Sequence, residues 1–190
     1  FYLLALIALF AAIRRFISRI SSKKFQWISL VLLAAILVLI RYLMLEHHFP
    51  SVFRRMDLFQ PHYFAISNAV PSLGDLFLHA LFVFFYMSVF SKCISFKLPR
   101  KNYLQYITLI IFTGISFGVF VIFHHYFESL ILHSSISFEG YKFFDLSIYS
   151  LIGYLVIVLL LSSFFFLIDL FLRKIQSEIN FRQFIIIFVS

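Results

Sequence analysis

The chain has 190 residues, of which 63% are hydrophobic and 13% are charged. Soluble domains average about 45–50% apolar and about 25% charged residues, so this chain has too few polar side chains to cover a soluble surface and too few charges for a disordered protein. The net charge of +8 lies in clusters beside apolar runs, not on the face of a polar domain, which argues against nucleic-acid binding. The single cysteine, Cys93, excludes an intrachain disulfide and a cysteine-rich zinc site.

Apolar runs long enough to cross a membrane recur along the chain. A membrane-spanning helix needs about 20 mainly apolar residues. The sequence therefore predicts one all-α membrane module over residues 1–190, a polytopic bundle of about six transmembrane helices. The predicted helices cover 1–13, 27–45, 73–92, 103–124, 146–172 and 184–190. Because the chain starts and ends inside apolar runs, we expect it to be a fragment whose first and last helices are truncated.

The loops between these helices alternate in charge. The loops after the first, third and fifth predicted helices hold most of the 16 Lys and Arg residues. Short loops rich in Lys and Arg lie on the cytoplasmic side of a membrane. This pattern predicts that the two longer segments, 46–72 and 125–145, are structured and lie outside the cytoplasm.

The first outer segment, 46–72, is rich in aromatic residues and holds three of the four prolines. We expect it to lie in the lipid headgroup zone or to cap the bundle. Ser72 and Asp75 have the spacing of a capping box at the start of the third helix. A ligand or proton site at Asp75 is the alternative, because ionisable residues inside membranes are often functional. Arg41, near the outer end of the second helix, is expected to snorkel to the interface.

The fourth and fifth helices and the segment between them carry weaker signals. Gly114 and Gly118 form a GxxxG motif, which permits close helix packing. Alternating residues at 135–138 favour a short extended piece, and Asp145 or Ser147 is expected to cap the fifth helix. Near the end of that helix, Asp169 and Arg173 have the spacing of an intrahelical ion pair. The sequence also predicts that the mid-helix regions are nearly free of charge.

Six of the 7 histidines fall in or beside the outer segments. The pairs His47–His48 and His124–His125 are candidates for an external metal or pH-sensing site, because imidazole binds transition metals and titrates near neutral pH. Adjacent histidines on a helix point in different directions, and no HExxH motif is present. The favoured interpretation is therefore an interfacial role with no metal.

Motifs of catalysis and of cofactor binding are absent from the sequence. It has no nucleophile elbow, no P-loop and no glycine-rich phosphate loop. We therefore expect no catalytic residue, no cofactor and no enzymatic activity in this fragment.

Short runs in both outer segments resemble a known family when they are taken in order. The runs are Phe49–Ser51, Leu58–Pro61, Tyr63–Ala65 and Pro71–Leu76 in the first segment, and Leu130–Phe138 and Ser147–Gly153 around the second. Together they resemble the membrane region of sensor histidine kinases of the Bacteroidota. That family typically has Asn where this chain has His133.

The resemblance implies the membrane sensor region of a two-component histidine kinase in the bacterial cytoplasmic (inner) membrane. Such a region transmits an extracytoplasmic or intramembrane stimulus to a cytoplasmic kinase that this chain does not contain. The implied partners are the lipid bilayer, a second copy in the full-length homodimer and a response regulator, but no nucleic acid. A transporter, a channel or a membrane-embedded scaffold is the alternative. The candidate sensory or structural residues of the outer face are Asp57, Pro61, Tyr63, Pro71, Ser72, Gly74, Asp75, Ser137 and Tyr149.

Overall fold

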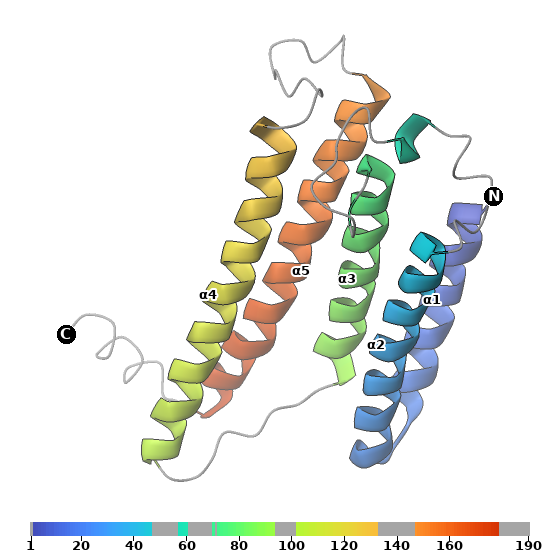
Figure 1. Ribbon diagram of the computed structural model, residues 1–190. Coiled ribbons are helices and arrows are strands. Elements are labelled where there is room, and N and C mark those ends of the chain that lie inside the picture. The colour runs from blue at the N-terminus through green and yellow to red at the C-terminus, as the bar shows by residue number, and fades with distance from the viewer. Residues whose placement is uncertain are drawn as a thin grey trace.

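The computed structural model describes residues 2–46, 57–60, 70, 72–93, 102–132 and 147–178. These residues form an all-α fold of five helices and one short 3-10 helix, η2. The elements are α1 (Tyr2–Arg19), α2 (Lys23–Glu46), η2 (Asp57–Phe59), α3 (Leu73–Cys93), α4 (Asn102–Leu132) and α5 (Ile148–Glu178). The five long helices lie side by side and alternate in direction along the chain (Figure 1).

Among the described residues, four helices are long and apolar enough to span a membrane. They are α2, α3, α4 and α5. The 18-residue α1 is not among them and carries Arg14, Arg15 and Arg19 in its second half. These helices make the chain a multi-pass membrane protein. The sixth helix, expected over 184–190, lies outside the described residues.

Several helices extend further than the apolar runs suggested. Helices α1 and α2 include the basic residues on either side of the turn that joins them. Lys and Arg favour helices, and their long side chains reach from the apolar region into the membrane interface. Helix α4 continues to Leu132, so residues 125–132, which we had assigned to the second outer segment, are helical. That stretch contains neither Gly nor Pro, so nothing local ends the helix there.

Charged residues sort to the two ends of the bundle. We call the end that holds Glu46, the start of α3 and the start of α5 the upper end, and the opposite one the lower end (Figure 1). The lower end holds the basic residues of the α1–α2 turn and of the end of α3, namely Arg14, Arg15, Arg19, Lys23, Lys24 and Lys92. The acidic residues of the upper end are Glu46, Asp57, Asp75 and Glu128.

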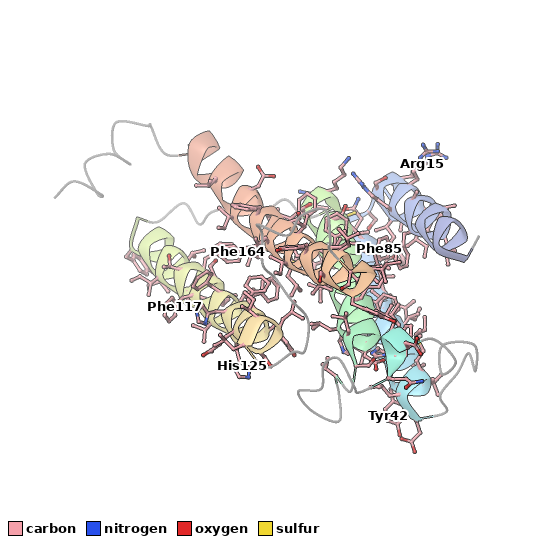
Figure 2. The ribbon with its side chains drawn as sticks, turned by 90° about the horizontal axis from the view of Figure 1, so that it is seen from above. Arg15, Tyr42, Phe85, Phe117, His125 and Phe164 are labelled. Atoms are coloured by element: carbon pink, nitrogen blue, oxygen red, sulfur yellow. The ribbon has the colours of Figure 1, made fainter. Side chains whose placement is uncertain are left out.

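Helix α3 is the centre of the bundle and contacts α1, α2, α5 and η2. Its upper half, with Leu73, Leu76 and Ala80, packs against Leu130 of α4 and Val156 of α5. Its lower half belongs to a second apolar cluster with α1 and α2, formed by Ile17, Leu30, Leu33, Leu37, Phe85 and Val89. Figure 2 labels Phe85 within this packed region, where its ring stacks on that of Phe10 at a centroid distance of 3.8 Å.

Helix α4 lies at the edge of the bundle, beside α5 (Figure 1). Only 6% of its spanning window is buried, against 50% for α3. A Cβ atom added at Gly114 or Gly118 would have no atom within 4 Å. Within the single chain no described neighbour uses the close approach that this GxxxG motif permits, because α4 turns this face away from the other helices.

Candidate functional site

A buried ion pair joins α2 to α3 at the upper end of the bundle. The Arg41 Nη2 donates a hydrogen bond to the Asp75 Oδ1 at 2.6 Å. Arg41 and Asp75 are only 7% and 8% exposed. The expectation that Arg41 snorkels to the interface is therefore wrong. A carboxylate 34 residues along the chain meets the guanidinium inside the bundle, and pairing of this kind is how membrane proteins accommodate charges below the interface.

The same carboxylate takes part in the start of α3. The Ser72 Oγ accepts a hydrogen bond from the Asp75 backbone N–H at 3.1 Å, and its hydroxyl donates to the Asp75 Oδ2 at 2.5 Å. The predicted cap at Ser72 is confirmed. The reciprocal half of a capping box is not formed by Asp75, because its carboxylate oxygens bind the Ser72 hydroxyl and Arg41. Asp75 therefore couples the start of α3 to the position of α2.

Gly74 lets η2 sit directly on the first turn of α3. A Cβ atom at this position would lie 2.8 Å from ring carbons of Phe59. Real Cβ atoms do not approach that closely, so any larger residue would displace the ring. Leu58, the neighbour of Phe59, packs against the upper apolar cluster. Helix η2 thus rests on the first turn of α3, the turn in which Asp75 binds Arg41.

The start of α5 joins the same end of the bundle. The Tyr149 hydroxyl donates to the Asp57 Oδ2 at 3.5 Å, a long contact between η2 and α5. Ser147 caps α5, since its Oγ accepts the Ser150 backbone N–H at 3.1 Å. The cap expected at Asp145 or Ser147 is thereby confirmed at Ser147. Asp57, which the sequence analysis places in the first outer segment, thus contacts the start of the predicted fifth helix at the upper end.

His79 lies one turn below Asp75 and is partly buried. Its Nδ1 is 3.0 Å from the Asp75 backbone oxygen. A carbonyl oxygen can only accept a hydrogen bond, so Nδ1 carries the hydrogen and Nε2 is left to other partners. His79 therefore lies beside the polar cluster that Arg41, Ser72 and Asp75 form at the upper ends of α2 and α3.

The other two histidines in the described part of the chain, His124 and His125, do not join this cluster. His124 and His125 are exposed near the upper end of α4, and His125 lies on the opposite side of the bundle from Tyr42 of α2 (Figure 2). In the described ranges, no group of three or more His, Cys, Asp or Glu residues has the arrangement of a metal site. A meeting of the two His–His pairs stays a prediction, because His47 and His48 lie outside those ranges.

A cavity of about 430 Å³ lies between α2 and α3, beside the ion pair. Arg41 and His79 line it near the upper end, and its other walls are mostly apolar. Val38 and Tyr42 line the cavity and are 69% and 58% exposed. In Figure 2 the side chain of Tyr42 projects away from the bundle. The cavity therefore opens sideways from the bundle, towards the lipid that surrounds a multi-pass membrane protein.

Other residues from the sequence analysis are not part of the described site. Pro61, Tyr63, Pro71 and Ser137 lie outside the described residues, as does the side chain of Arg173, so its pairing with Asp169 stays a prediction. Sequence reasoning missed the partnership of Arg41 with Asp75. A signal was available, because an Arg near the end of one span and an Asp at the start of the next lie at the same depth when the two helices are antiparallel.

No family model, no curated protein and no solved structure matches the chain. The fold and the site therefore define its class on geometry alone. It is a multi-pass membrane protein in which a buried ion pair joins α2 to α3 at the upper end of the bundle.

Proposed function

We propose that the chain is the membrane sensor region of a two-component histidine kinase in the bacterial cytoplasmic membrane. Two lines of support converge on the upper end of the bundle. The ordered sequence runs that resemble such kinases include Leu58–Pro61, Pro71–Leu76 and Ser147–Gly153. The described residues of these runs form η2, the start of α3 and the start of α5.

The observation that carries the proposal is the buried Arg41–Asp75 pair. It joins α2 to the first turn of α3, on which η2 also rests, and α3 shares its most extensive contact with α5. A stimulus that loosens the pair would free α2 from α3 and allow α3 to repack against α5. Signalling proteins use such changes between two packings, which differ by about a few kcal/mol.

The output would leave the bundle at the lower end. In this proposal the segment that follows α5, including the helix expected over 184–190, carries the shift to a cytoplasmic kinase domain in the complete protein. The homodimer and the response regulator implied by the resemblance would then be its partners. The unknown stimulus would act from outside the cytoplasm or from within the membrane.

The test uses the complete gene product in lipid vesicles with ATP. We expect phosphorylation on a histidine, and we expect Asp75→Asn to change its rate severalfold while Glu128→Gln, an exposed acid at the upper end of α4, leaves the rate unchanged. Comparable amounts of inserted protein must be verified for each variant. A complete protein without histidine phosphorylation would refute the proposal and favour a transporter, a channel or a scaffold.

The orientation is a separate part of the proposal, and it places the upper end outside the cytoplasm. Single cysteines at Ser22→Cys and Glu128→Cys, in a Cys93→Ser background, place one probe at each end of the bundle. A membrane-impermeant maleimide applied to intact cells should label only the Glu128→Cys protein. Labelling of both positions, or of Ser22→Cys alone, would contradict the orientation.

A further inference from the structure

The basic residues of the lower end lie on the turn between α1 and α2 and on the adjoining end of α3. Ile13 of α1 and Cys93 of α3 pack against the same apolar cluster, which places these parts of the two helices side by side. All of these basic side chains are exposed except that of Arg14, which is half-buried. We call them the basic face: Arg14, Arg15, Arg19, Lys23, Lys24 and Lys92.

The basic face has no acidic partner among the described residues. The first acidic residue of the chain is Glu46, at the upper end of α2, so no carboxylate lies on α1 or on the lower part of α2. None of the six basic side chains forms an ion pair within the described ranges. Like charges that lie close together repel one another. An anionic partner would therefore stabilise this end of the bundle.

Exposed aromatic side chains beside the basic face indicate that it lies against lipid. Phe16, Phe25 and Trp27 are 71%, 64% and 45% exposed. Arg15 lies about 6 Å above the end of α1, and Trp27 lies about 6 Å above the start of α2, at about 1.5 Å per residue. Tryptophan is enriched at the headgroup level of a membrane. The side chain of Arg15, which points away from the other helices in Figure 2, is thus placed at the level of the lipid phosphates.

We propose that the basic face binds the phosphodiester headgroups of anionic phospholipids such as phosphatidylglycerol. The guanidinium groups of Arg15 and Arg19 suit paired hydrogen bonds to phosphate oxygens, and Lys23 adds positive charge. The acyl chains lie against Phe16 and Phe25. A zwitterionic headgroup carries its own ammonium group and so compensates the face less well. The proposal stands apart from the kinase proposal, because the turn would bind these lipids whatever follows the chain.

Trp27 is the single tryptophan of the chain, so its fluorescence reports on the lipids beside the basic face. The test places the complete chain in phosphatidylcholine vesicles in which a fixed fraction of the lipid is brominated on its acyl chains. The brominated lipid is either phosphatidylglycerol or phosphatidylcholine. We expect the anionic lipid to quench Trp27 more strongly, with about tenfold tighter binding, and the preference to fall in about 1 M salt. Equal quenching by the two lipids at low salt would overturn the proposal.

Matched variants separate charge from local disturbance. Lys23→Gln together with Lys24→Gln removes two charges and should lower the preference to about threefold or less. Lys23→Arg together with Lys24→Arg keeps both charges and should keep the preference. Ser18→Gln together with Ser21→Gln changes exposed residues beside the same turn without changing charge, and it should have no effect. If the first variant fails to insert, the salt dependence of the unaltered chain decides the outcome. A full preference in that variant, or an equal loss in the serine control, would overturn the proposal.

Discussion

Helices α3 and α4 are both apolar enough to span a membrane, yet only α3 is well packed. Half of the spanning window of α3 is buried, against 6% of that of α4. Helix α3 begins with a serine cap, a glycine under an aromatic ring and a carboxylate paired to α2. The two glycines of α4 face open space. The difference indicates what places a helix at the centre of the bundle. Polar and small residues that contact neighbouring elements decide it, and the apolarity of the helix does not.

The physical reason lies in the solvent. Lipid tails are as apolar as Leu or Phe, so an apolar helix face gains little by leaving lipid for another helix. A buried charge gains much from its partner, because lipid offers it no alternative. The upper end of α3 carries such a charge at Asp75. The exposed side chains of α4, such as Ile110 and Phe117, are solvated by lipid tails and need no neighbouring helix.

Of the substitutions that compare α3 with α4, the one at Asp75 is expected to lower the free energy of unfolding most. Asp75→Leu leaves the Arg41 guanidinium buried without its partner, which should lower the free energy of unfolding by about 3–5 kcal/mol. Glu128→Leu on α4 removes an exposed acid and should change it by about 0.5 kcal/mol at most. Denaturant or thermal unfolding of the whole chain in detergent micelles measures both. Equal effects of the two substitutions would remove the distinction between the helices.

Replacing one glycine by alanine in each helix should change the free energy of unfolding in opposite directions. Gly74→Ala displaces the ring of Phe59 from its position on α3 and should destabilise the protein by about 1–3 kcal/mol. Gly114→Ala meets open space and removes a flexible residue from a helix interior, so it should stabilise the protein by about 0.5–1 kcal/mol. The same unfolding measurement applies. Stabilisation at position 74 would show that η2 does not rest on α3.

The smallest effect is expected at Tyr149. Its hydroxyl contact with Asp57 is long, at 3.5 Å, and exposed. Tyr149→Phe should therefore lower the free energy of unfolding by no more than about 0.5 kcal/mol. Tyr42→Phe, a substitution of an exposed tyrosine on α2, is the control. A loss at Tyr149 comparable to that at Asp75 would show that the joint between η2 and α5 stabilises the upper end as much as the ion pair does.

The membrane-spanning helices and their caps could be predicted from local sequence. Apolar run length predicts the spans, and the caps at Ser72 and Ser147 follow from residue type and spacing. The Arg41–Asp75 pair was missed because each residue had an adequate local explanation, as a snorkelling arginine and as a helix cap. Only the antiparallel packing of α2 on α3 brings the two together. Gly114 and Gly118 teach a related lesson, since a small-residue motif permits a contact but does not supply a neighbour.

The cavity between α2 and α3 could not have been predicted from the sequence. It depends on the shape left between two helices, and its wall residues are apolar side chains of the kind found throughout the chain. His79 gave no special signal either, because a lone histidine near an interface is common. Its hydrogen bond to the Asp75 backbone oxygen is evident only from the structure.

The central claim is that the pairing of Arg41 with Asp75 holds α2 on α3, and a double-mutant cycle tests it directly. The cycle compares Arg41→Met, Asp75→Leu and the double variant by the free energy of unfolding. We expect a coupling of about 1.5–3 kcal/mol and a double variant more stable than Asp75→Leu alone, because no unpaired charge remains in it. Single effects that add to within about 0.5 kcal/mol would show that the two residues act independently and would contradict the claim.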